Sequence, residues 1–395
     1  MRLKLWLAAA LVAACPLPGA ESLPILAWAG PPADQTTPER YRELAEAGFT
    51  HSFSGFGSVP AMKSALDVAH AAGLKMLVSV PELSSEPEVT AAKFKDHPAV
   101  AGYYLRDEPN AADFPALAKL EERIRSADPD HPCYINLSPN YANSAQLGTA
   151  TYREHLERFI STVPVKFISF DHYPIVGNSV RDEWYENLEQ VADVARTANK
   201  PFWAFVLAVA HGPYPIPTIE HLRLQAFSDL AYGAQAIQYF TYWTPTSKEW
   251  DFHEGPIDTH GHRTVVYDRV AQVNEEIRAL SSVFLRARVR SVRHTGALPK
   301  GTRAYEPQAP VRSLRADGGA VVSTLEKGPR RHLVIVNRDF NKPMPLEIAF
   351  DPASKVAELR KDGAVHPVES DSLARSVPPG DAVIFVWEVE KDGGG

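Results

Sequence analysis

The chain has 395 residues, of which 45% are hydrophobic and 23% charged, and its formal net charge is −7. This composition is ordinary for a globular protein. An acidic chain without a Lys/Arg-rich run lacks the positive surface that binds phosphate backbones, which excludes a nucleic-acid partner. The length suits a barrel-sized domain followed by a smaller one.

The N-terminus, MRLKLWLAAALVAACPLPGAES, predicts an export signal over residues 1–20, because a basic start precedes an apolar run too short to span a bilayer. We therefore expect a periplasmic, secreted or surface-anchored protein. VAAC at 12–15 also resembles the lipobox of bacterial lipoproteins, which implies a lipid anchor at Cys15; plain cleavage near Ala20 is the alternative. Cys133 is then the only cysteine of the mature chain and has no partner for an internal disulfide. No later segment is long and apolar enough to cross a membrane.

Beyond the signal, short runs rich in β-branched and aromatic residues alternate with amphipathic segments of helical spacing. The least clear helical segment is EVTAAKFKDHP (88–98). Eight such units predict a (β/α)₈ TIM barrel, and the near-continuous apolar character of the runs fits parallel strands covered on both faces. An open doubly wound sheet is the alternative, but no Gly-rich phosphate motif follows the first strand. The expected strands are 23–29, 49–56, 74–80, 100–108, 133–138, 165–173, 201–210 and 236–243.

After about residue 288 the helical spacing stops, and strand-like runs are separated by Gly, Pro and Asp turns. This pattern predicts a small antiparallel β-sandwich. We therefore expect a barrel domain over residues 21–287 and a sandwich domain over residues 288–391.

Reactive side chains of such a barrel gather at the carboxyl ends of its strands. The expected strand ends supply aromatic rings, amides, imidazoles and carboxylates, a mixture that suits a sugar better than a phosphate. Each tryptophan taken singly also fits an ordinary core position. The candidate substrate-binding residues are Trp28, His51, Asp107, Asn136, His172, Tyr173, Trp203, His211, Tyr239 and Trp243.

The stretch VAGYYLRDEPN (100–110) places Asp107 and Glu108 side by side at the end of an apolar strand. Carboxylates in such a place are costly unless they have partners or a function. Glu108 is our candidate general acid, because a carboxyl group held protonated at a barrel mouth can protonate a leaving glycosidic oxygen. The alternative is that the acidic residues and Pro109 only begin the next helix.

The ordered set of motifs resembles the clan A glycoside hydrolases, most nearly the β-galactosidase branch with a C-terminal β-domain. Asp107-Glu108-Pro109 resembles the Asn-Glu-Pro motif that closes the fourth strand in that clan, and FDHYP (170–174) and GAQAIQYFTYW (233–243) resemble the ends of its sixth and eighth strands. The resemblance implies a carbohydrate substrate, an acid/base role for Glu108 and no cofactor.

The seventh strand departs from that resemblance. Clan A retaining enzymes carry a nucleophilic glutamate there, whereas PFWAFVLAVAHG has no carboxylate near Val206 or Leu207. Asp171 is the candidate second carboxylate, acting as a base across a gap of about 6.5–9.5 Å in an inverting reaction. The alternative for Asp171 is a buried residue that orients His172 or Tyr173.

The segment TSKEWDFHEGPID (246–258) offers three further acids, Glu249, Asp251 and Glu254, for which solvated surface positions are the alternative. We expect this segment to fold over the mouth as a lid, with Trp250 against the ligand.

We therefore expect a glycoside hydrolase acting on an extracellular oligo- or polysaccharide. One alternative is a barrel that has lost its nucleophile and only binds carbohydrate. Another is a metal-dependent hydrolase using His51, His172 and His211 with Asp171 or Glu108, although ILAWAG lacks the His-x-His pair of barrel amidohydrolases, and we expect no metal.

Overall fold

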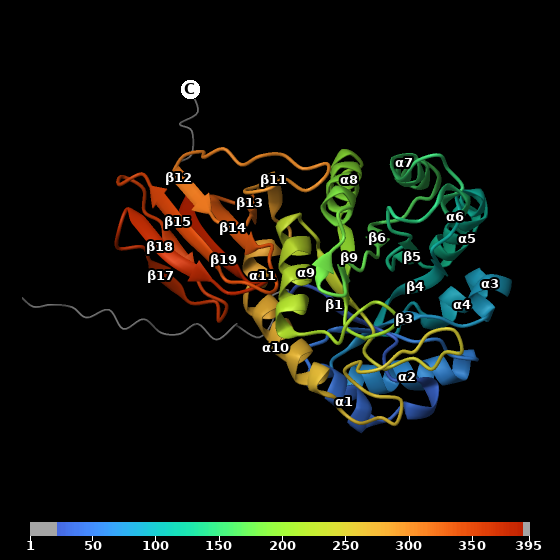
Figure 1. The fold of residues 1–395 in the computed structure, drawn as a ribbon. Coiled ribbons are helices and arrows are strands. Elements are labelled where there is room, and N and C mark those ends of the chain that lie inside the picture. Colours follow the sequence, from blue (N-terminus) through green and yellow to red (C-terminus); the bar gives the residue numbers. More distant parts are fainter. Residues whose placement is uncertain (1–21, 390–395) are drawn as a thin grey trace, which may run out of the picture.

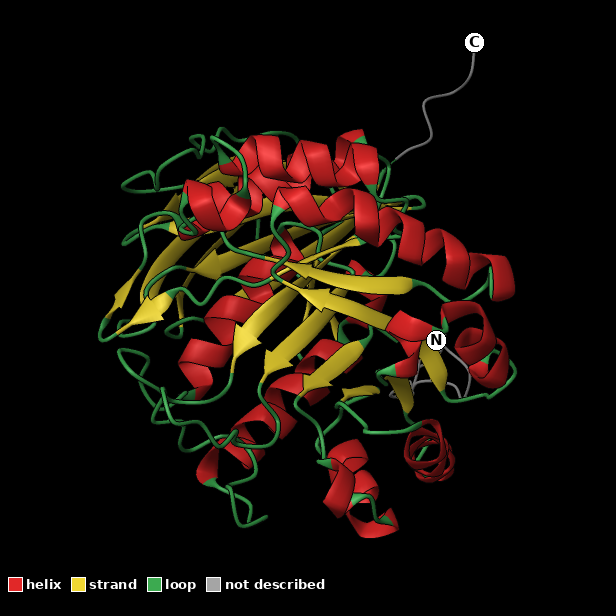
Figure 2. Ribbon diagram, turned by 90° about the vertical axis from the view of Figure 1, so that its right-hand side faces the viewer, coloured by secondary structure: helices red, strands yellow, loops and turns green. Residues whose placement is uncertain are grey.

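The computed structural model describes residues 22–389, so the expected export signal and Cys15 lie outside the described residues. Eight parallel strands close into a barrel in the order β1-β10-β9-β6-β5-β4-β3-β2, with helices around them (Figures 1 and 2). The expected (β/α)₈ barrel is confirmed. Its strands are β1 (Ile25–Trp28), β2 (His51–Phe53), β3 (Lys75–Val78), β4 (Val100–Asp107), β5 (Cys133–Leu137), β6 (Ile168–Phe170), β9 (Phe202–Leu207) and β10 (Ala236–Phe240).

Helices follow the strands, and most begin at a side chain that caps their free backbone N–H groups. The N-cap oxygens of Thr37, Ser58, Thr151, Thr218 and Thr264 accept such bonds. The least clear helical segment of the sequence does form a helix, α4. No helix in residues 22–389 is long and apolar enough to cross a membrane. The helices are α1 (Pro38–Glu46), α2 (Val59–Ala71), α3 (Glu82–Ser85), α4 (Pro87–Phe94), α5 (Phe114–Ala127), α6 (Ser144–Leu147), α7 (Tyr152–Thr162), α8 (Trp184–Thr197), α9 (Ile219–Ala231), α10 (Val265–Ala279) and α11 (Ser281–Phe284), with 3₁₀ turns η1 (Ala33–Gln35) and η2 (Ala111–Asp113).

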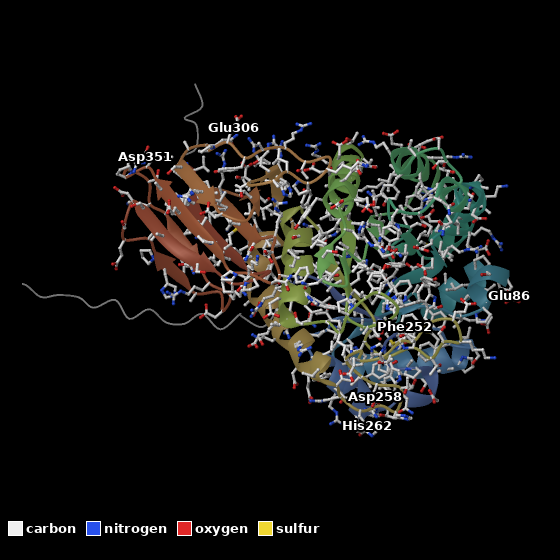
Figure 3. All side chains as sticks on the ribbon, viewed as in Figure 1. Glu86, Phe252, Asp258, His262, Glu306 and Asp351 are labelled. Atoms are coloured by element: carbon white, nitrogen blue, oxygen red, sulfur yellow. The ribbon has the colours of Figure 1, made fainter. Side chains whose placement is uncertain are left out.

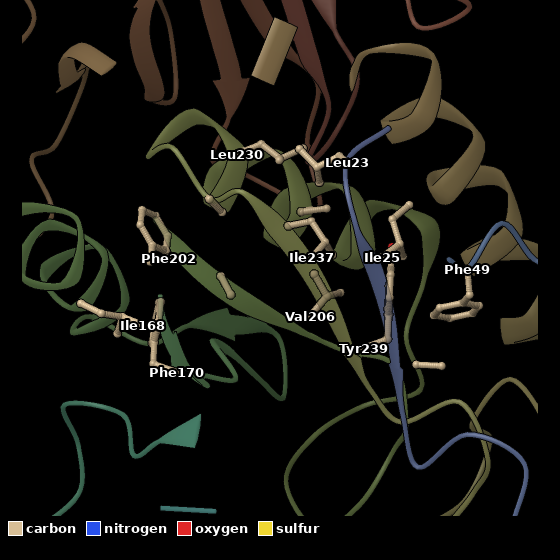
Figure 4. Packing of buried hydrophobic residues seen from close by; sticks show 14 of the residues in the cluster. Leu23, Ile25, Phe49, Ile168, Phe170, Phe202, Val206, Leu230, Ile237 and Tyr239 are labelled. Atoms are coloured by element: carbon tan, nitrogen blue, oxygen red, sulfur yellow. The ribbon is translucent and has the colours of Figure 1, made fainter. Parts of the chain in front are cut away.

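Two apolar layers support the barrel. Outward-facing strand side chains such as Ile25 and Val206 pack beneath the helices (Figure 4). Inside the barrel, aromatic rings form a separate cluster: the Trp28 ring centroid lies 4.4 Å from that of Phe53 and 5.7 Å from that of Tyr134. The barrel interior is therefore filled by side chains, and a ligand can bind only above them, at the mouth.

The C-terminal region is the expected β-sandwich, which the structure confirms (Figure 1). One sheet has six strands in the order β11-β13-β14-β19-β16-β17, and the other has three in the order β12-β15-β18. The two sheets enclose a core of their own. The strands are β11 (Arg288–His294), β12 (Val311–Ala316), β13 (Ala320–Lys327), β14 (Arg330–Asn337), β15 (Met344–Phe350), β16 (Ala357–Leu359), β17 (Val365–Pro367), β18 (Ser372–Val377) and β19 (Ala382–Glu388).

Helix α9 joins the barrel to the sandwich. All its residues from Leu224 to Ala231 are buried, and the apolar ones among them belong to one cluster with residues of β13 and β14. Ser323 of β13 donates a hydrogen bond of 2.7 Å to the Ala231 carbonyl at the end of the helix. Arg223 of α9 pairs with Glu276 of α10, which also accepts from the sandwich residue Lys361 at 3.3 Å. The larger sheet thus covers the outer face of α9.

Candidate active site

Strand β4 carries Asp107 and Glu108 to the mouth of the barrel. The Glu108 backbone N–H donates to the Asn136 carbonyl at 2.8 Å, so the ladder with β5 continues to this residue. Glu108 has a φ of 41°, in the left-handed region that costs a residue with a Cβ roughly 1–2 kcal/mol. Strain of this kind persists where the surrounding structure holds a residue for a function.

Neither acid caps the following helix. Asn110 does so instead: its Oδ1 accepts from the Ala112 N–H at 2.9 Å, and its own N–H donates to Asp113 Oδ2 at 3.2 Å. The helix-start explanation of the motif is therefore wrong for Asp107 and Glu108, whose carboxyl groups face other partners.

Asn136, at the end of β5, connects two of the acids. Its Nδ2 donates to Asp171 Oδ1 at 2.9 Å and to Asp107 Oδ1 at 3.1 Å. Its Oδ1 accepts a hydrogen bond of 2.9 Å from Ser169 Oγ, which in turn accepts from Gln238 Nε2 at 2.9 Å. Because both ends of the Asn136 amide are engaged, its orientation is fixed, and with it the spacing of the two carboxylates.

The three carboxyl groups have no cationic partner among residues 22–389. Burial raises the pKa of Asp171 well above its usual value, and the charges of Glu108 and Asp107 raise it further. Burial and the Asp107 charge also raise the pKa of Glu108, while a hydrogen bond with Asp171 partly offsets them. Burial likewise raises the pKa of Asp107, against the hydrogen bond from Asn136. Asp107 and Glu108 keep contact with solvent, whereas Asp171 is only 7% exposed, so burial acts most strongly on Asp171.

The contact between Glu108 and Asp171 has a chemical consequence. Two carboxyl groups within hydrogen-bonding reach cannot both be ionised at little cost, so the pair holds a proton at pH values where an isolated carboxyl has lost it. The pair therefore retains a proton that Glu108 can transfer.

Besides Asp107 and Asn136, three of the predicted binding residues lie around this pair or close to it. His172 is buried, donates from Nδ1 to Asn187 Oδ1 at 3.0 Å, and has its pKa lowered to about 3 by burial, so it is neutral. The Tyr173 ring lies 5.5 Å from that of Phe240 at the end of β10. His211 follows β9, and burial lowers its pKa as well.

Other predicted binding residues lie elsewhere. His51 is the first residue of β2 and Trp203 the second of β9, so the expectation that they stand at carboxyl ends of strands was wrong; their rings lie 6.4 Å apart at the opposite end of the barrel. Tyr239 points outward and packs against Phe49 at 5.4 Å (Figure 4). Trp28, in contrast, is the last residue of β1, at a carboxyl end as expected, and its ring belongs to the interior aromatic cluster. Trp243 packs in the outer core, with the Arg40 guanidinium 5.3 Å above its ring.

The segment after β10 is attached to the loop after β9. Asp251 Oδ1 accepts from the Gly212 N–H at 2.7 Å, and His253 exchanges two backbone hydrogen bonds of 3.0 Å with Ala210. Phe252, labelled in Figure 3, lies with its ring 4.6 Å from that of His211, while Trp250 remains 50% exposed. The segment borders the site through Phe252, and its role as a lid stays a prediction.

Sequence reasoning missed Tyr141, Arg181 and Tyr214, which come together beside His172 and His211. Arg181 follows a short hairpin, β7 (Ile175–Val176) and β8 (Ser179–Val180), inserted after β6. None of the three stands at a barrel strand end, so the rule that selected the other candidates did not reach them. No group of three or more His, Cys, Asp or Glu side chains in the described part of the chain is arranged to hold a metal ion.

A family model described as β-galactosidase, for glycoside hydrolase family 42, matches residues 112–280. The chain is similar to the clan A glycoside hydrolases. The matched region runs from η2 to the end of α10, and the match supports O-glycosyl hydrolase activity. No curated protein sequence matches the chain.

Solved structures of glycoside hydrolases share the fold. A β-galactosidase from Bacillus circulans sp. alkalophilus aligns over 93% of this chain and 99% of its own, with a TM-score of 0.65 at 10% identity. A catalytic mutant of a GH42 β-galactosidase from G. stearothermophilus aligns over 93% and 98%, with a TM-score of 0.63 at 9% identity. A family 39 glycoside hydrolase from Bacteroides cellulosilyticus WH2 aligns over 93% and 81%, with a TM-score of 0.55 at 11% identity. At these identities the likeness establishes the fold.

Proposed function

We propose that this protein hydrolyses a glycosidic bond of an oligo- or polysaccharide outside the cytoplasm, with Glu108 as the general acid. The observation that carries the proposal is the gathering of Asp107, Glu108 and the buried Asp171 at the ends of β4 and β6, where Asn136 bridges Asp107 and Asp171 and no ion pair in residues 22–389 compensates the acids. Burial and the Asp107 charge raise the pKa of Glu108, so this group keeps its proton to a higher pH than an isolated carboxyl group, and departure of a sugar oxygen requires that proton.

In the proposed reaction Glu108 gives its proton to the glycosidic oxygen as the bond from that oxygen to the anomeric carbon breaks. A water molecule attacks the anomeric carbon and loses a proton to Asp171, the candidate base, which acts in the ionised form that the Asn136 hydrogen bond favours. Inversion requires a water molecule between the two carboxyl groups, which takes a separation of about 6.5–9.5 Å. Asn136 holds Asp171 and Asp107 in place.

Replacement of Glu108 by Gln tests the assignment. The variant keeps the shape of the side chain and cannot transfer the proton, so we expect kcat on a responsive glycoside to fall about 10²–10⁴-fold. Glu86→Gln, at an exposed position between α3 and α4 (Figure 3), is the matched control. Turnover that survives Glu108→Gln would remove this residue from the mechanism. The anomeric configuration of the product, observed by NMR, tests the role of Asp171. Retention of configuration would reject Asp171 as the base that activates water, whereas inversion would agree with that role.

A carbohydrate-binding barrel without catalysis is the second candidate, and one observation favours it. Strand β9 (Phe202–Leu207) carries no carboxylate, although the resemblance places a nucleophile there. Calorimetry with a glycan panel and product analysis on the same panel separate the two functions. Binding without any release of sugar across the panel would favour the binding barrel.

A further inference from the structure

An arc of rings and one guanidinium borders the acid pair on the side of β6 and β9. The His172 ring lies 5.0 Å from that of Tyr141, and the Arg181 guanidinium carbon lies 4.5 Å from the Tyr141 ring centroid. On its other side Arg181 donates from Nη2 to the Tyr214 hydroxyl at 3.2 Å. The Tyr214 ring then lies 4.7 Å from that of His211. These five residues form one continuous contact chain, which we call the Arg181 arc.

The Arg181 arc adjoins the acids directly. His172 follows Asp171 in the chain, and the Asp171 charge is near enough to raise the pKa of Tyr141. The Tyr173 ring, which also feels the charges of Asp171 and Glu108, lies 6.1 Å from that of Tyr214. A sugar whose glycosidic oxygen meets Glu108 therefore has its neighbouring substituents close to this arc.

Three nitrogens of the arc are buried without a hydrogen-bond partner: Arg181 Nε, His172 Nε2 and His211 Nδ1. Buried polar atoms in proteins are almost always paired, so three orphans in one contact chain need an explanation. Because His172 Nδ1 donates to Asn187, its Nε2 is an acceptor suited to a sugar hydroxyl.

Arg181 is also a half-buried cation without an acidic partner. In residues 22–389 no Asp or Glu forms an ion pair with it, whereas Arg263, likewise stacked 4.1 Å from a tyrosine ring, pairs with both Glu43 and Glu46. Stacking on Tyr141 and bonding to Tyr214 hold the guanidinium plane in one orientation. A fixed, uncompensated guanidinium is suited to bind a carboxylate through two parallel hydrogen bonds.

We propose that Arg181 binds the carboxylate of a uronic acid residue in the glycan substrate. This inference rests on the proposed function for the placement of the sugar, and it adds the substrate class. The three acids repel a second negative charge, whereas the Arg181 guanidinium attracts one. A uronic acid is therefore oriented with its carboxylate on the arc and its glycosidic oxygen toward Glu108.

Calorimetry in the Glu108→Gln background tests the inference without requiring turnover. Two pairs of ligands differ only at C6: methyl glucuronide against methyl glucoside, and methyl galacturonide against methyl galactoside, each as both anomers. We expect one uronide to bind more tightly than its neutral partner. Arg181→Gln should weaken that uronide about 10–100-fold, the range for a charged hydrogen-bonding pair. Arg181→Lys should restore part of the loss, because it keeps the charge without the planar fork.

Arg42→Gln, which removes an exposed positive charge from α1, is the control for net charge, and thermal unfolding shows whether each variant is folded. Equal binding of uronides and neutral glycosides, or uronide binding that Arg181→Gln leaves intact, would overturn the inference. The methyl glycosides sulfated at O6 serve as a further anionic control, and tighter binding of such a sulfate than of the uronide would overturn the carboxylate assignment. Arg181-dependent uronide binding with no hydrolysis by the intact protein would support this site while rejecting the hydrolase proposal, so the two failures are distinguishable.

Discussion

Asn136 Nδ2 donates a 2.9 Å hydrogen bond to Asp171 Oδ1, and the same nitrogen donates to Asp107 Oδ1 at 3.1 Å. One amide on β5 therefore sets the relative position of acids carried by β4 and β6. It also supplies the main stabilisation of the ionised forms of two carboxylates that lack cations.

Asn136→Ala should thus reduce catalysis without touching either acid. With the amide gone, the pKa of Asp171 rises further and both carboxylates lose their fixed orientation. We expect kcat/KM on a glycoside substrate to fall about 10–100-fold, in the range observed when supporting groups of a site are removed. Wild-type kinetics in a folded Asn136→Ala variant would show that the acids are held by other contacts.

The pH dependence of kcat/KM should have an alkaline limb set by Glu108. A general acid works only when protonated, so activity falls as pH rises through its pKa, which burial and the Asp107 charge raise. Asp107→Asn removes that charge and should lower the pKa of Glu108, which shifts the alkaline limb to lower pH. An unshifted limb in the pH–rate profile of Asp107→Asn would mean that another group controls it.

Asp171→Asn should stabilise the folded protein at alkaline pH. The pKa of Asp171 is raised on folding, so its contribution to stability is present at low pH and is lost as pH rises through the folded pKa. Asn cannot ionise and avoids this loss. We expect a gain of about 1 kcal/mol in the free energy of unfolding at pH 8 and a smaller gain at pH 5, measured by denaturant titration at both pH values. A gain independent of pH would contradict the charge explanation.

The backbone at position 108 gives a prediction that does not depend on chemistry. Glycine adopts positive φ without a Cβ penalty, so Glu108→Gly should be more stable than Glu108→Ala by about 1 kcal/mol. Both variants lose the carboxyl group, which makes each the control of the other. Equal unfolding temperatures would show that the φ of 41° carries no strain.

The fold was predictable because strand-like and helix-like segments alternate eight times, and the helical spacing then stops near residue 288. The ends of the strands were harder to predict. The run 49–56 was expected as one strand, but only His51–Phe53 pair in β2, which places His51 at the wrong end of the barrel. Tyr239 illustrates a second difficulty, because a shift of one residue in a strand turns a side chain from the interior to the helix layer.

The acid cluster was predictable in part because its members end three successive strands, β4, β5 and β6. Their hydrogen-bond partners were not, since the Asn136 bridge depends on how the strands are staggered around the barrel. Arg181 had no sequence signal at all: it enters the site from an inserted hairpin, and only its contacts with Tyr141 and Tyr214 give it a place.

Helix α9 restricts how this architecture can be divided. Its buried run from Leu224 to Ala231 faces strands on one side and the sandwich on the other, and the loop before the helix holds His211 and Tyr214. A shortened version ending after α11 would expose the apolar residues of this helix that the sandwich now covers. We therefore expect a minimal barrel of this chain to need polar substitutions along α9 before it stays in solution.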